Sequence, residues 1–455
     1  MQTQKSYTKE NPKKPTRSIS GVTPLTVVLK PRKCDHGTCI FCPGGDYVPQ
    51  SYTDKSPAIM RALTMAFDPY RQVNARLNAL QKMGHPTDKI EVIVLGGTFL
   101  QYEIDYQYEF IKRCFDALNR KDSQNLEEAK KINETAEYRC VALCIENRPD
   151  NCSPEEIRRM LEFGATRVEI GIQILDDEIY KKINRGHKVE DVVQASKDLK
   201  NAGFKLGYHI MPGLPYSNPE KDMEKFKLLF YDSRFRPDQL KIYPCQIVDD
   251  SPLAKMYKKI NYMPYDEETT RKILTEMMQV IPEYCRVMRV MREIPKEKMT
   301  ITPLKLELRK EVEEKLRESG IKINEIRMRE IGFNKEVDDN IILKILEYEA
   351  SEGKEFFLQL VNKDDILFGL LRLRISERGA MVRELHIYGK ALEIGKKGEV
   401  SQHRGLGKWL MDEAEKIVKE KGMKKIAVIS GIGVREYYKK LGYNLEGFYM
   451  VKTLK

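Results

Sequence analysis

Three of the nine cysteines in this 455-residue chain lie close together, at Cys34, Cys39 and Cys42. Thiolates bind zinc and iron–sulfur clusters, and three of them on one loop can surround a single metal centre. A structural zinc ion takes four protein ligands, and His36 could supply the fourth. A cluster held by three thiolates keeps one iron without a protein ligand, and that iron could bind a substrate. The spacing alone leaves both kinds of metal centre open.

A second group of residues, near the C-terminus, has the composition of a phosphate-binding loop. Gly405 and Gly407 stand at the start of an amphipathic stretch that predicts a helix over residues 405–421. Glycines at the start of a helix let backbone N–H groups approach a phosphate, and the helix dipole favours the anion. The loop is a weak signal alone, but a predicted strand precedes it and another follows the helix.

Alternating strand and helix patterns predict the scaffold that positions the cysteines. Six strand–helix units in succession predict a parallel sheet, in the form of an open or partial barrel. Chemistry in such sheets takes place where the strands end, and the cysteines follow the first strand while Gly96, Gly97 and Thr98 follow the second. The predicted strands cover residues 25–29, 90–95, 140–145, 167–172, 205–211 and 239–243.

The pattern changes after the sixth strand. Residues 252–331 are mostly helical and highly charged, and a second α/β unit follows them. Its predicted strands cover residues 356–360, 366–375, 381–388, 425–430 and 449–453. The fold class is therefore α/β, with a partial (β/α)6 barrel ahead of a smaller α/β domain. We place a basic arm at residues 1–20, the barrel domain at 21–285, a connecting region at 286–331 and the second domain at 332–455.

Composition and charge restrict the class of protein. The chain has 41% hydrophobic and 32% charged residues and shows neither a membrane-spanning run nor a signal peptide, which predicts a cytoplasmic protein without a membrane partner. The odd number of cysteines argues against a disulfide framework. Residues 1–33 hold eight basic residues and one acid, out of a net charge of +11. Such an arm suits a phosphate backbone, although charge alone slightly favours a solvated tail.

The cysteine segment resembles the radical S-adenosylmethionine (SAM) superfamily. Phe41 precedes the last cysteine, and Pro43-Gly44-Gly45 follows it, while the spacing has one residue more than the commonest form. The resemblance implies a [4Fe–4S] cluster on Cys34, Cys39 and Cys42, with SAM on the open iron as the source of a 5′-deoxyadenosyl radical. It also implies that Gly96, Gly97 and Thr98 approach the methionyl part of SAM.

The C-terminal domain resembles the GNAT acetyltransferases. The resemblance implies that a loop and a strand bind acetyl-CoA, and that a tyrosine protonates the leaving thiolate, which suits a phenol with a pKa of about 10. Tyr438 and Tyr437 are the candidates, and we expect one of them to pack in the core instead. Glu384 could be a base, or it could be half-buried and paired. The implied acetyl-CoA ligands are Glu384, Leu385, His386 and Ile387 on the strand, and Gln402, Gly405, Leu406, Gly407 and Lys408 on the loop.

Together the two halves resemble the family of Elongator catalytic subunits, in their stand-alone archaeal form, over nearly the whole chain. Matching segments include 39–45, 146–150, 184–187 and 382–386. The resemblance implies carboxymethylation of the wobble uridine of tRNA at carbon 5, with acetyl-CoA and an electron donor as partners and no DNA. It implies that Lys89 contacts acetyl-CoA from the barrel domain as a binding and catalytic residue. We expect the open iron and the thioester to meet in one shared chamber.

Two departures from the family accompany this resemblance. The first cysteine is already at position 34, so the basic arm is short and we expect weaker tRNA binding. Cys285 has no nearby partner in sequence, so we expect no zinc between the domains.

Two other functions compete with this one. A protein lysine acetyltransferase with histone-like substrates would need no tRNA, and the basic arm argues mildly against basic protein tails. A tRNA-binding scaffold with a structural cluster would have no activity to lose.

Overall fold

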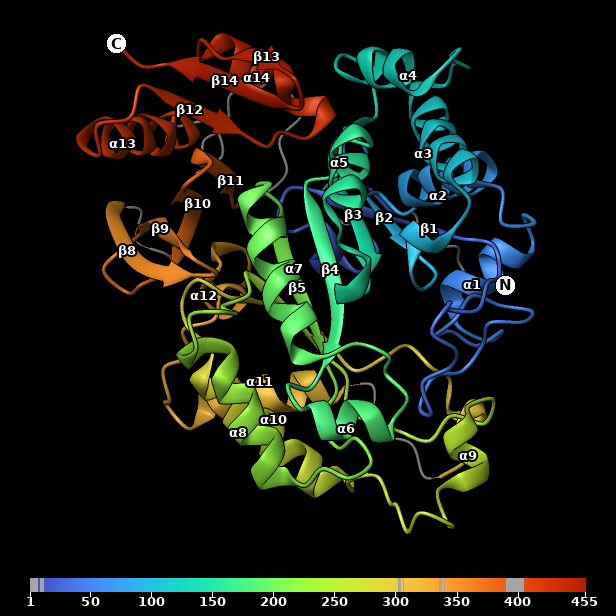
Figure 1. The fold of residues 1–455 in the computed structure, drawn as a ribbon. Coiled ribbons are helices and arrows are strands. Elements are labelled where there is room, and N and C mark those ends of the chain that lie inside the picture. Colours follow the sequence, from blue (N-terminus) through green and yellow to red (C-terminus); the bar gives the residue numbers. More distant parts are fainter. Residues whose placement is uncertain are drawn as a thin grey trace.

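A computed structural model gives the fold and describes residues 7–8, 12–301, 304–305, 307–334, 338, 340–389 and 405–455. Two seven-stranded sheets dominate it (Figure 1). The first lies in the centre of the molecule, and the second, coloured orange and red, packs at its upper left. Among the described residues, none of the helices combines the length and apolar character that crossing a membrane requires.

The first sheet is a partial barrel of parallel strands in sequence order, with β1 and β7 as open edges. All six predicted strands are present, so the predicted partial barrel is confirmed. A seventh strand, β7, continues the sheet beyond residue 285. The strands are β1 (Thr23–Val28), β2 (Lys89–Leu95), β3 (Arg139–Asn147), β4 (Arg167–Gln173), β5 (Lys205–Ile210), β6 (Gln239–Ile242) and β7 (Arg286–Val290).

Helices cover the outside of this barrel and extend from it (Figure 1). Several begin at a side chain that accepts a backbone N–H, as Ser153 does in a complete capping box ahead of a proline. They are α1 (Pro57–Leu63), α2 (Pro69–Lys82), α3 (Ile104–Asn119), α4 (Leu126–Asn133), α5 (Pro154–Glu162), α6 (Asp177–Lys182), α7 (Val189–Asn201), α8 (Pro219–Tyr231), α9 (Pro252–Met256), α10 (Glu267–Val280), α11 (Leu308–Glu318) and α12 (Ile326–Arg329).

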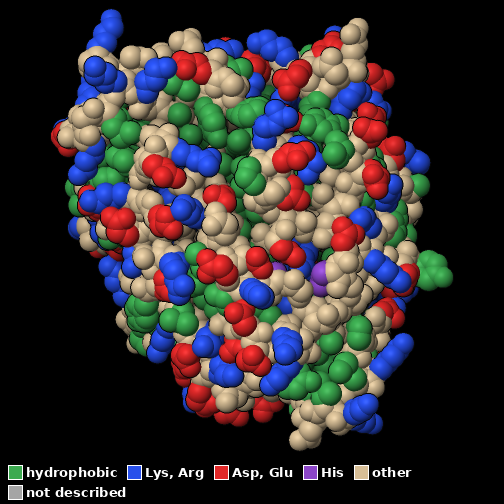
Figure 2. Space-filling model, viewed as in Figure 1, with side chains coloured by type: hydrophobic (Ala, Val, Ile, Leu, Met, Phe, Trp, Pro, Cys, Tyr) green, Lys and Arg blue, Asp and Glu red, His purple; other side chains and the backbone are tan. Residues whose placement is uncertain are grey.

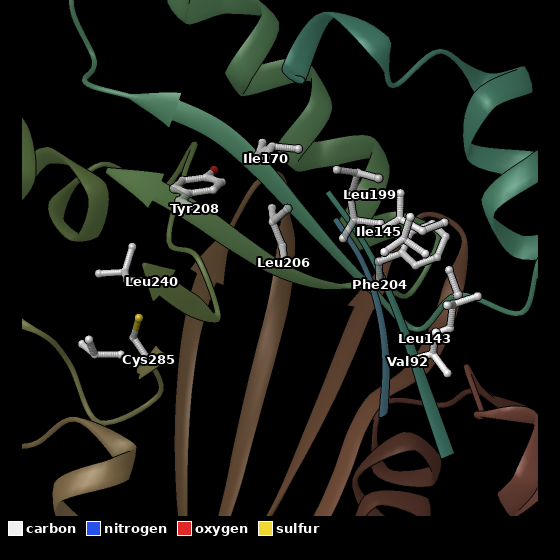
Figure 3. Close-up of a cluster of buried hydrophobic side chains, with 14 of the residues drawn as sticks. Val92, Leu143, Ile145, Ile170, Leu199, Phe204, Leu206, Tyr208, Leu240 and Cys285 are labelled. Atoms are coloured by element: carbon white, nitrogen blue, oxygen red, sulfur yellow. The ribbon is translucent and has the colours of Figure 1, made fainter. Parts of the chain in front are cut away.

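The main hydrophobic core lies between the barrel strands and these helices. Leu143, Ile170 and Leu206 from neighbouring strands pack there with Leu199 of α7 (Figure 3). Each such side chain, fully buried, contributes about 1.5–3 kcal/mol. Because successive side chains of a strand point to opposite faces, the residues between them face the barrel interior, which we call the lumen. The lumen is lined by charged groups rather than by a second apolar layer.

The second sheet has the order β13-β14-β12-β11-β10-β9-β8, and the predicted GNAT-type domain is confirmed. β11 pairs in parallel with β12 only from Ala380 to Val382, so the two strands separate beyond that point. Its elements are β8 (Ile342–Ala350), β9 (Gly353–Val361), β10 (Leu367–Ser376), β11 (Gly379–Ile387), α13 (Leu406–Glu420), β12 (Lys425–Val428), α14 (Arg435–Lys440), β13 (Asn444–Glu446) and β14 (Tyr449–Thr453). We did not predict β8 or β13.

Buried ion pairs join the two domains. Arg383 of β11 donates to both oxygens of Asp238, at 2.8 and 2.7 Å, in the segment that leads into β6. The same guanidinium pairs with Glu355 at 3.0 Å, and Arg374 of β10 donates to Asn201 of the barrel domain at 2.9 Å. All of these groups are buried, so the two domains are held in one fixed arrangement.

Lys200 of α7, beside this interface, provides a pH-dependent contribution to stability. Its ammonium donates to the carbonyls of Phe235 and Arg236, and burial lowers its pKa to about 7. Between about pH 7 and pH 10 the unfolded chain therefore binds more protons than the folded chain, and stability rises with pH. We expect the wild type to gain up to about 1.4 kcal/mol per pH unit relative to Lys200→Met. Calorimetry of both proteins across this range checks it, and parallel pH profiles would contradict it.

Candidate active site

The three cysteines of the loop after β1 line a cavity of about 310 Å³ at the carboxyl ends of the strands. Cys42 donates to or accepts from Ser51 at 3.0 Å, and Cys34 lies 3.9 Å from the hydroxyl of Thr98. Burial and the neighbouring thiols raise the pKa of Cys34 to about 11. Metal binding at these thiols therefore has to displace protons.

The spacing of the sulfurs fits a cluster better than one zinc ion. Among the described residues, one set of three potential ligands has all its ligand atoms within 4.8 Å of one another, and it does not contain the cysteines. Zinc at Zn–S bonds of about 2.3 Å would need its ligand atoms closer than that. His36, the candidate fourth ligand, lies 3.3 Å from the sulfur of Cys39 and accepts from Arg148 at 3.1 Å.

Two buried arginines line the cysteine cavity, and one of them, Arg148, is paired with Asp150 at 2.7 Å. Arg185 donates to the sulfur of Cys39 at 3.5 Å, and Arg148 contacts His36. Burial and these guanidinium groups lower the pKa of His36 to about 4. Three thiolates carry negative charge, which the two arginines offset. Gly97 and Thr98 also line the cavity, and Gly96 lies behind it against Leu29, at a φ of 138°.

Glu146 and His209 line this cavity, and together with the buried Glu169 they form the set of potential ligands just mentioned. The ammonium of Lys241 pairs with both carboxylates, at 2.9 Å from Glu146. Burial opposes charge here, yet each partner stabilises the other, so the pKa of Lys241 lies well above and that of Glu169 well below its usual range. Lys241 supplies the positive charge that a metal ion would bring, so these three side chains and Lys241 form a group of ion pairs.

A second cavity, of about 500 Å³, lies between the amino ends of the barrel strands and the separated ends of β11 and β12. Lys89 and Lys205 line it from the barrel. Most of the predicted acetyl-CoA ligands line it from the other side, namely Glu384, Leu385, His386, Ile387, Gly405, Leu406, Gly407 and Lys408. Gln402 lies outside the described residues.

Charged partners decide the state of Glu384. Lys205 pairs with it at 2.6 Å and Arg372 at 2.8 Å. Burial opposes ionisation, but these two cations hold the pKa of Glu384 below its usual range. Glu384 is therefore a paired carboxylate. Burial lowers the pKa of Lys89 from its ordinary value.

The two adjacent tyrosines have different surroundings. Tyr438 is 6% exposed and packs in the core of the second domain, while Tyr437 is 37% exposed. Both line the second cavity. A methyl group on Gly407 would lie 2.7 Å from the hydroxyl of Tyr437, so that hydroxyl stands against the start of α13. Burial raises the pKa of Tyr437 to about 12 and that of Tyr438 further.

Several lining residues were missed in the sequence. Ser20 and Thr166 also line the second cavity, and the carbonyl of Ser20 accepts from His386 at 2.9 Å. Lys205 and Thr166 stand at the amino ends of strands, where a barrel gives no sequence signal for a site. Their role depends on the second domain packing there, which no periodicity in one chain reveals.

The chamber that we expected the two sites to share is divided into two cavities in this structure. Among the described residues, the two cavities have no lining residue in common. On β2 they lie at opposite ends, since Lys89 lines one and Ile93 the other, but at the start of β1 they approach each other, where Val22 lines the second cavity and Pro24 the first. Four residues of strand correspond to roughly 13 Å.

Family models match three consecutive parts of the chain. Residues 28–229 match the Radical SAM superfamily, residues 237–318 a radical SAM C-terminal domain and residues 320–443 the acetyltransferase (GNAT) family. The cysteines fall in the first part, and the residues of the second cavity at Glu384 and Tyr438 fall in the third.

Whole-length relatives have the same order of domains. The tRNA uridine(34) acetyltransferase of Methanocaldococcus infernus is 48% identical over 97% of this chain and 87% of its own length. Elongator complex protein 3 of Schizosaccharomyces pombe is 37% identical over 97% of this chain and 86% of its own. The chain belongs to the Elongator complex protein 3 family.

A solved structure agrees with this membership of the Elongator complex protein 3 family. The archaeal Methanocaldococcus infernus Elp3 with residues 1–46 deleted matches with a TM-score of 0.85 and 43% identity, covering 96% of this chain and 100% of that chain. In the present chain, the radical SAM domain implies a [4Fe–4S] cluster and SAM, and the GNAT domain implies acetyl-CoA. The three thiols that line the first cavity and the open space beside Gly405 in the second fit these groups.

Proposed function

We propose that this chain is a cytoplasmic enzyme that installs a carboxymethyl group at carbon 5 of the wobble uridine of tRNA. The observation that carries the proposal is that one sheet bears a three-cysteine cavity at one end and an acetyl-CoA-type cavity at the other. A radical source and an acetyl donor in one rigid body suit the transfer of an acetyl carbon. Relatives named tRNA uridine(34) acetyltransferase support uridine 34 as the acceptor.

The residues take the following roles in this proposal. Cys34, Cys39 and Cys42 hold the cluster, and Gly96, Gly97 and Thr98 approach SAM. When bound, the cluster and SAM supply a 5′-deoxyadenosyl radical, after an external donor provides one electron. Gln402, Gly405, Leu406, Gly407 and Lys408 hold the pyrophosphate of acetyl-CoA. Glu384, Leu385, His386 and Ile387 hold the pantetheine arm, with Lys89 opposite.

The atoms balance as follows. The acetyl methyl loses a hydrogen atom to the 5′-deoxyadenosyl radical, giving 5′-deoxyadenosine, and its carbon forms a bond to carbon 5 of uridine. Carbon 5 then loses its proton and the uridine gives up one electron. The external donor, which was oxidised when it provided an electron at the start, takes this electron up. Water cleaves the thioester, leaving the carboxymethyl group and releasing CoA, whose thiolate receives a proton from the protein.

The open side of the barrel offers an entrance for the uridine. Arg61, Arg76, Arg289 and Arg292 line the cysteine cavity from segments near β1 and β7. Guanidinium groups bind phosphate in a bidentate way and suit an RNA backbone. On the face seen in Figure 2, acidic and basic side chains are interspersed, so the net positive charge does not form one patch there.

Reconstitution tests the proposal. The full chain, reconstituted anaerobically, receives SAM, acetyl-CoA, an electron donor and tRNA, and mass spectrometry of the nucleosides detects 5-carboxymethyluridine. Reactions that lack one component serve as controls. If cluster and acetyl-CoA are bound but no modified uridine forms, the proposal fails. Transfer of the acetyl group to histone-tail lysines without tRNA would instead support the protein acetyltransferase function.

The two tyrosines are expected to separate chemistry from binding. Although the ring of Tyr438 packs in the core, the residue also lines the cavity, and its phenol is protonated at neutral pH, so we expect it to be the acid that protonates the CoA thiolate. Tyr438→Phe should lower turnover about a hundredfold with little change in acetyl-CoA affinity. Tyr437→Phe should weaken acetyl-CoA binding about tenfold, because its hydroxyl stands at the start of α13. Steady-state kinetics and calorimetry measure both, and the reverse pattern would exchange the two roles.

A further inference from the structure

The lumen between the two cavities is filled by layers of side chains from neighbouring strands. Cys144, Arg167 and Lys205 are register neighbours in the layer nearest the second cavity. The next layer contains Glu146, Glu169, Gly207 and Gln239. The layer nearest the cysteine cavity contains Gly171, His209, Lys241 and Arg289.

Arg167 crosses the lumen. From β4 it reaches over β3 to Glu91 of β2, at 2.8 Å, and it also pairs with Glu169 at 3.3 Å. Its side chain is 2% exposed. Glu169 leans over Gly207, where a methyl group would lie 3.0 Å from its Cγ atom. The strand position that lacks a side chain is therefore covered by a carboxylate that Arg167 helps to hold.

The acetyl group has to cross this space if the proposed function is correct. The second cavity lies at the amino ends of the strands, and the cysteine cavity begins two residues further along the chain at β1 and four residues further along β2, which is roughly 7 to 13 Å. The fixed domain interface does not let the second cavity approach the first. The lumen is the direct route between the two, and Lys89 and Lys205 stand at its entrance.

We propose that the lumen is the passage for the acetyl end of acetyl-CoA, and that the Glu91–Arg167–Glu169 ion pairs are the bar that closes it. The proposal rests on the proposed function for its substrate. Charge pairs can close a lumen reversibly, because the guanidinium keeps one partner when it leaves the other. If packed apolar side chains closed the lumen, opening it would break all of their contacts at once. Glu91 is the outermost partner, so its loss should loosen the bar while Glu169 keeps Lys241 and His209.

Cys144 reports on the bar in the protein as purified. It lies in the lumen beside Arg167, is 0% exposed and stays outside the main hydrophobic core. Cys140, on the same strand, packs in that core, and the pKa of both thiols is raised by burial and, to a smaller extent, by the charge of Glu91. In Glu91→Gln, the change at Cys140 therefore measures the electrostatic effect and any loss of stability. Any increase in the alkylation of Cys144 that exceeds the increase at Cys140 measures opening of the lumen.

The first experiment alkylates wild-type and Glu91→Gln protein with iodoacetamide and follows each cysteine by peptide mass spectrometry. We expect the ratio of Cys144 to Cys140 modification to rise about tenfold in the variant, the factor for one lost charge-assisted hydrogen bond. Acetyl-CoA should protect Cys144 in the variant, while 3′-phospho-ADP, which lacks the pantetheine arm, should not. An unchanged ratio overturns the bar, and absence of protection overturns the route.

The second experiment separates this inference from the proposed function. Holoenzyme receives SAM and acetyl-CoA with a trideuterated methyl group, and deuterium in 5′-deoxyadenosine shows that the methyl met the radical. We expect Glu91→Gln to form about tenfold more deuterated product than the wild type without tRNA. If wild type with tRNA gives no deuterated product, the proposed function fails, whatever happens at Cys144. If the wild type with tRNA does give deuterated product but Glu91→Gln without tRNA gives no more of it than the wild type, only the proposal that these ion pairs close the lumen is overturned.

Discussion

Replacing Cys39 with serine is expected to abolish formation of 5-carboxymethyluridine while leaving a folded protein that still binds tRNA. A serine hydroxyl does not replace a thiolate as a cluster ligand, so two of the three protein bonds remain. The side chain is 3% exposed and loses one sulfur atom's contacts, which costs little stability. Iron analysis and visible absorbance measure the cluster, tRNA affinity measures binding, and nucleoside mass spectrometry measures the modification.

Cys114→Ser provides the matched control for this variant. Cys114 is also buried, but it lies on α3 in the hydrophobic core, away from the metal site. We expect it to keep full iron content and full modification activity. Wild-type activity in Cys39→Ser would contradict a catalytic cluster, and loss of tRNA binding in that variant would favour a structural one.

Asp238→Ala is expected to lower the free energy of unfolding by about 3–5 kcal/mol, the range for removing one partner of a buried ion pair. The carboxylate accepts two hydrogen bonds from Arg383 and one from the backbone N–H of Leu206 at 2.8 Å. Arg372 lies 3.5 Å from it. Removal of the Asp238 carboxylate leaves the positive charges of Arg383 and Arg372 buried with less negative charge beside them, at the contact between the domains. Urea denaturation followed by circular dichroism measures the change.

Asp232→Ala tests whether burial causes this effect. Asp232 pairs with Arg234 at 2.7 Å, but that arginine is 57% exposed. Exposed pairs contribute about 0.2–1 kcal/mol, so we expect a change within that range. Equal effects of the two substitutions would show that the interface charges do not hold the domains together.

Periodicity was sufficient to predict most of the fold. The strands from β1 to β6 are short apolar runs separated by amphipathic helices, and this alternation has few architectural solutions. β8 was missed because Lys344, Glu347 and Glu349 interrupt its apolar residues. β7 was missed because Arg286 and Arg289 make a five-residue strand look like a charged connection. Arg286 is largely buried at the domain interface, an environment that tertiary structure alone provides, whereas the side chain of Arg289 is 46% exposed.

The candidate site was predictable from the sequence only in part. Cys34, Cys39 and Cys42 come from one continuous loop, so their spacing carries the signal. The lumen residues come from separate strands, and a charged residue such as Glu169 or Lys241 in a strand resembles one that faces solvent. The two-cavity arrangement depends on which end of the barrel the second domain covers, and no residue spacing records that.

The interface between Arg383 and Asp238 also restricts how the molecule can move. A hinge motion that swung the second domain toward the cysteines would pull these charges apart in a dry environment, at a cost of several kcal/mol. Large excursions of whole domains are therefore unfavourable. In the function proposed above, the flexible pantetheine arm of acetyl-CoA would supply the reach instead, by moving the acetyl group between two sites that stay in place.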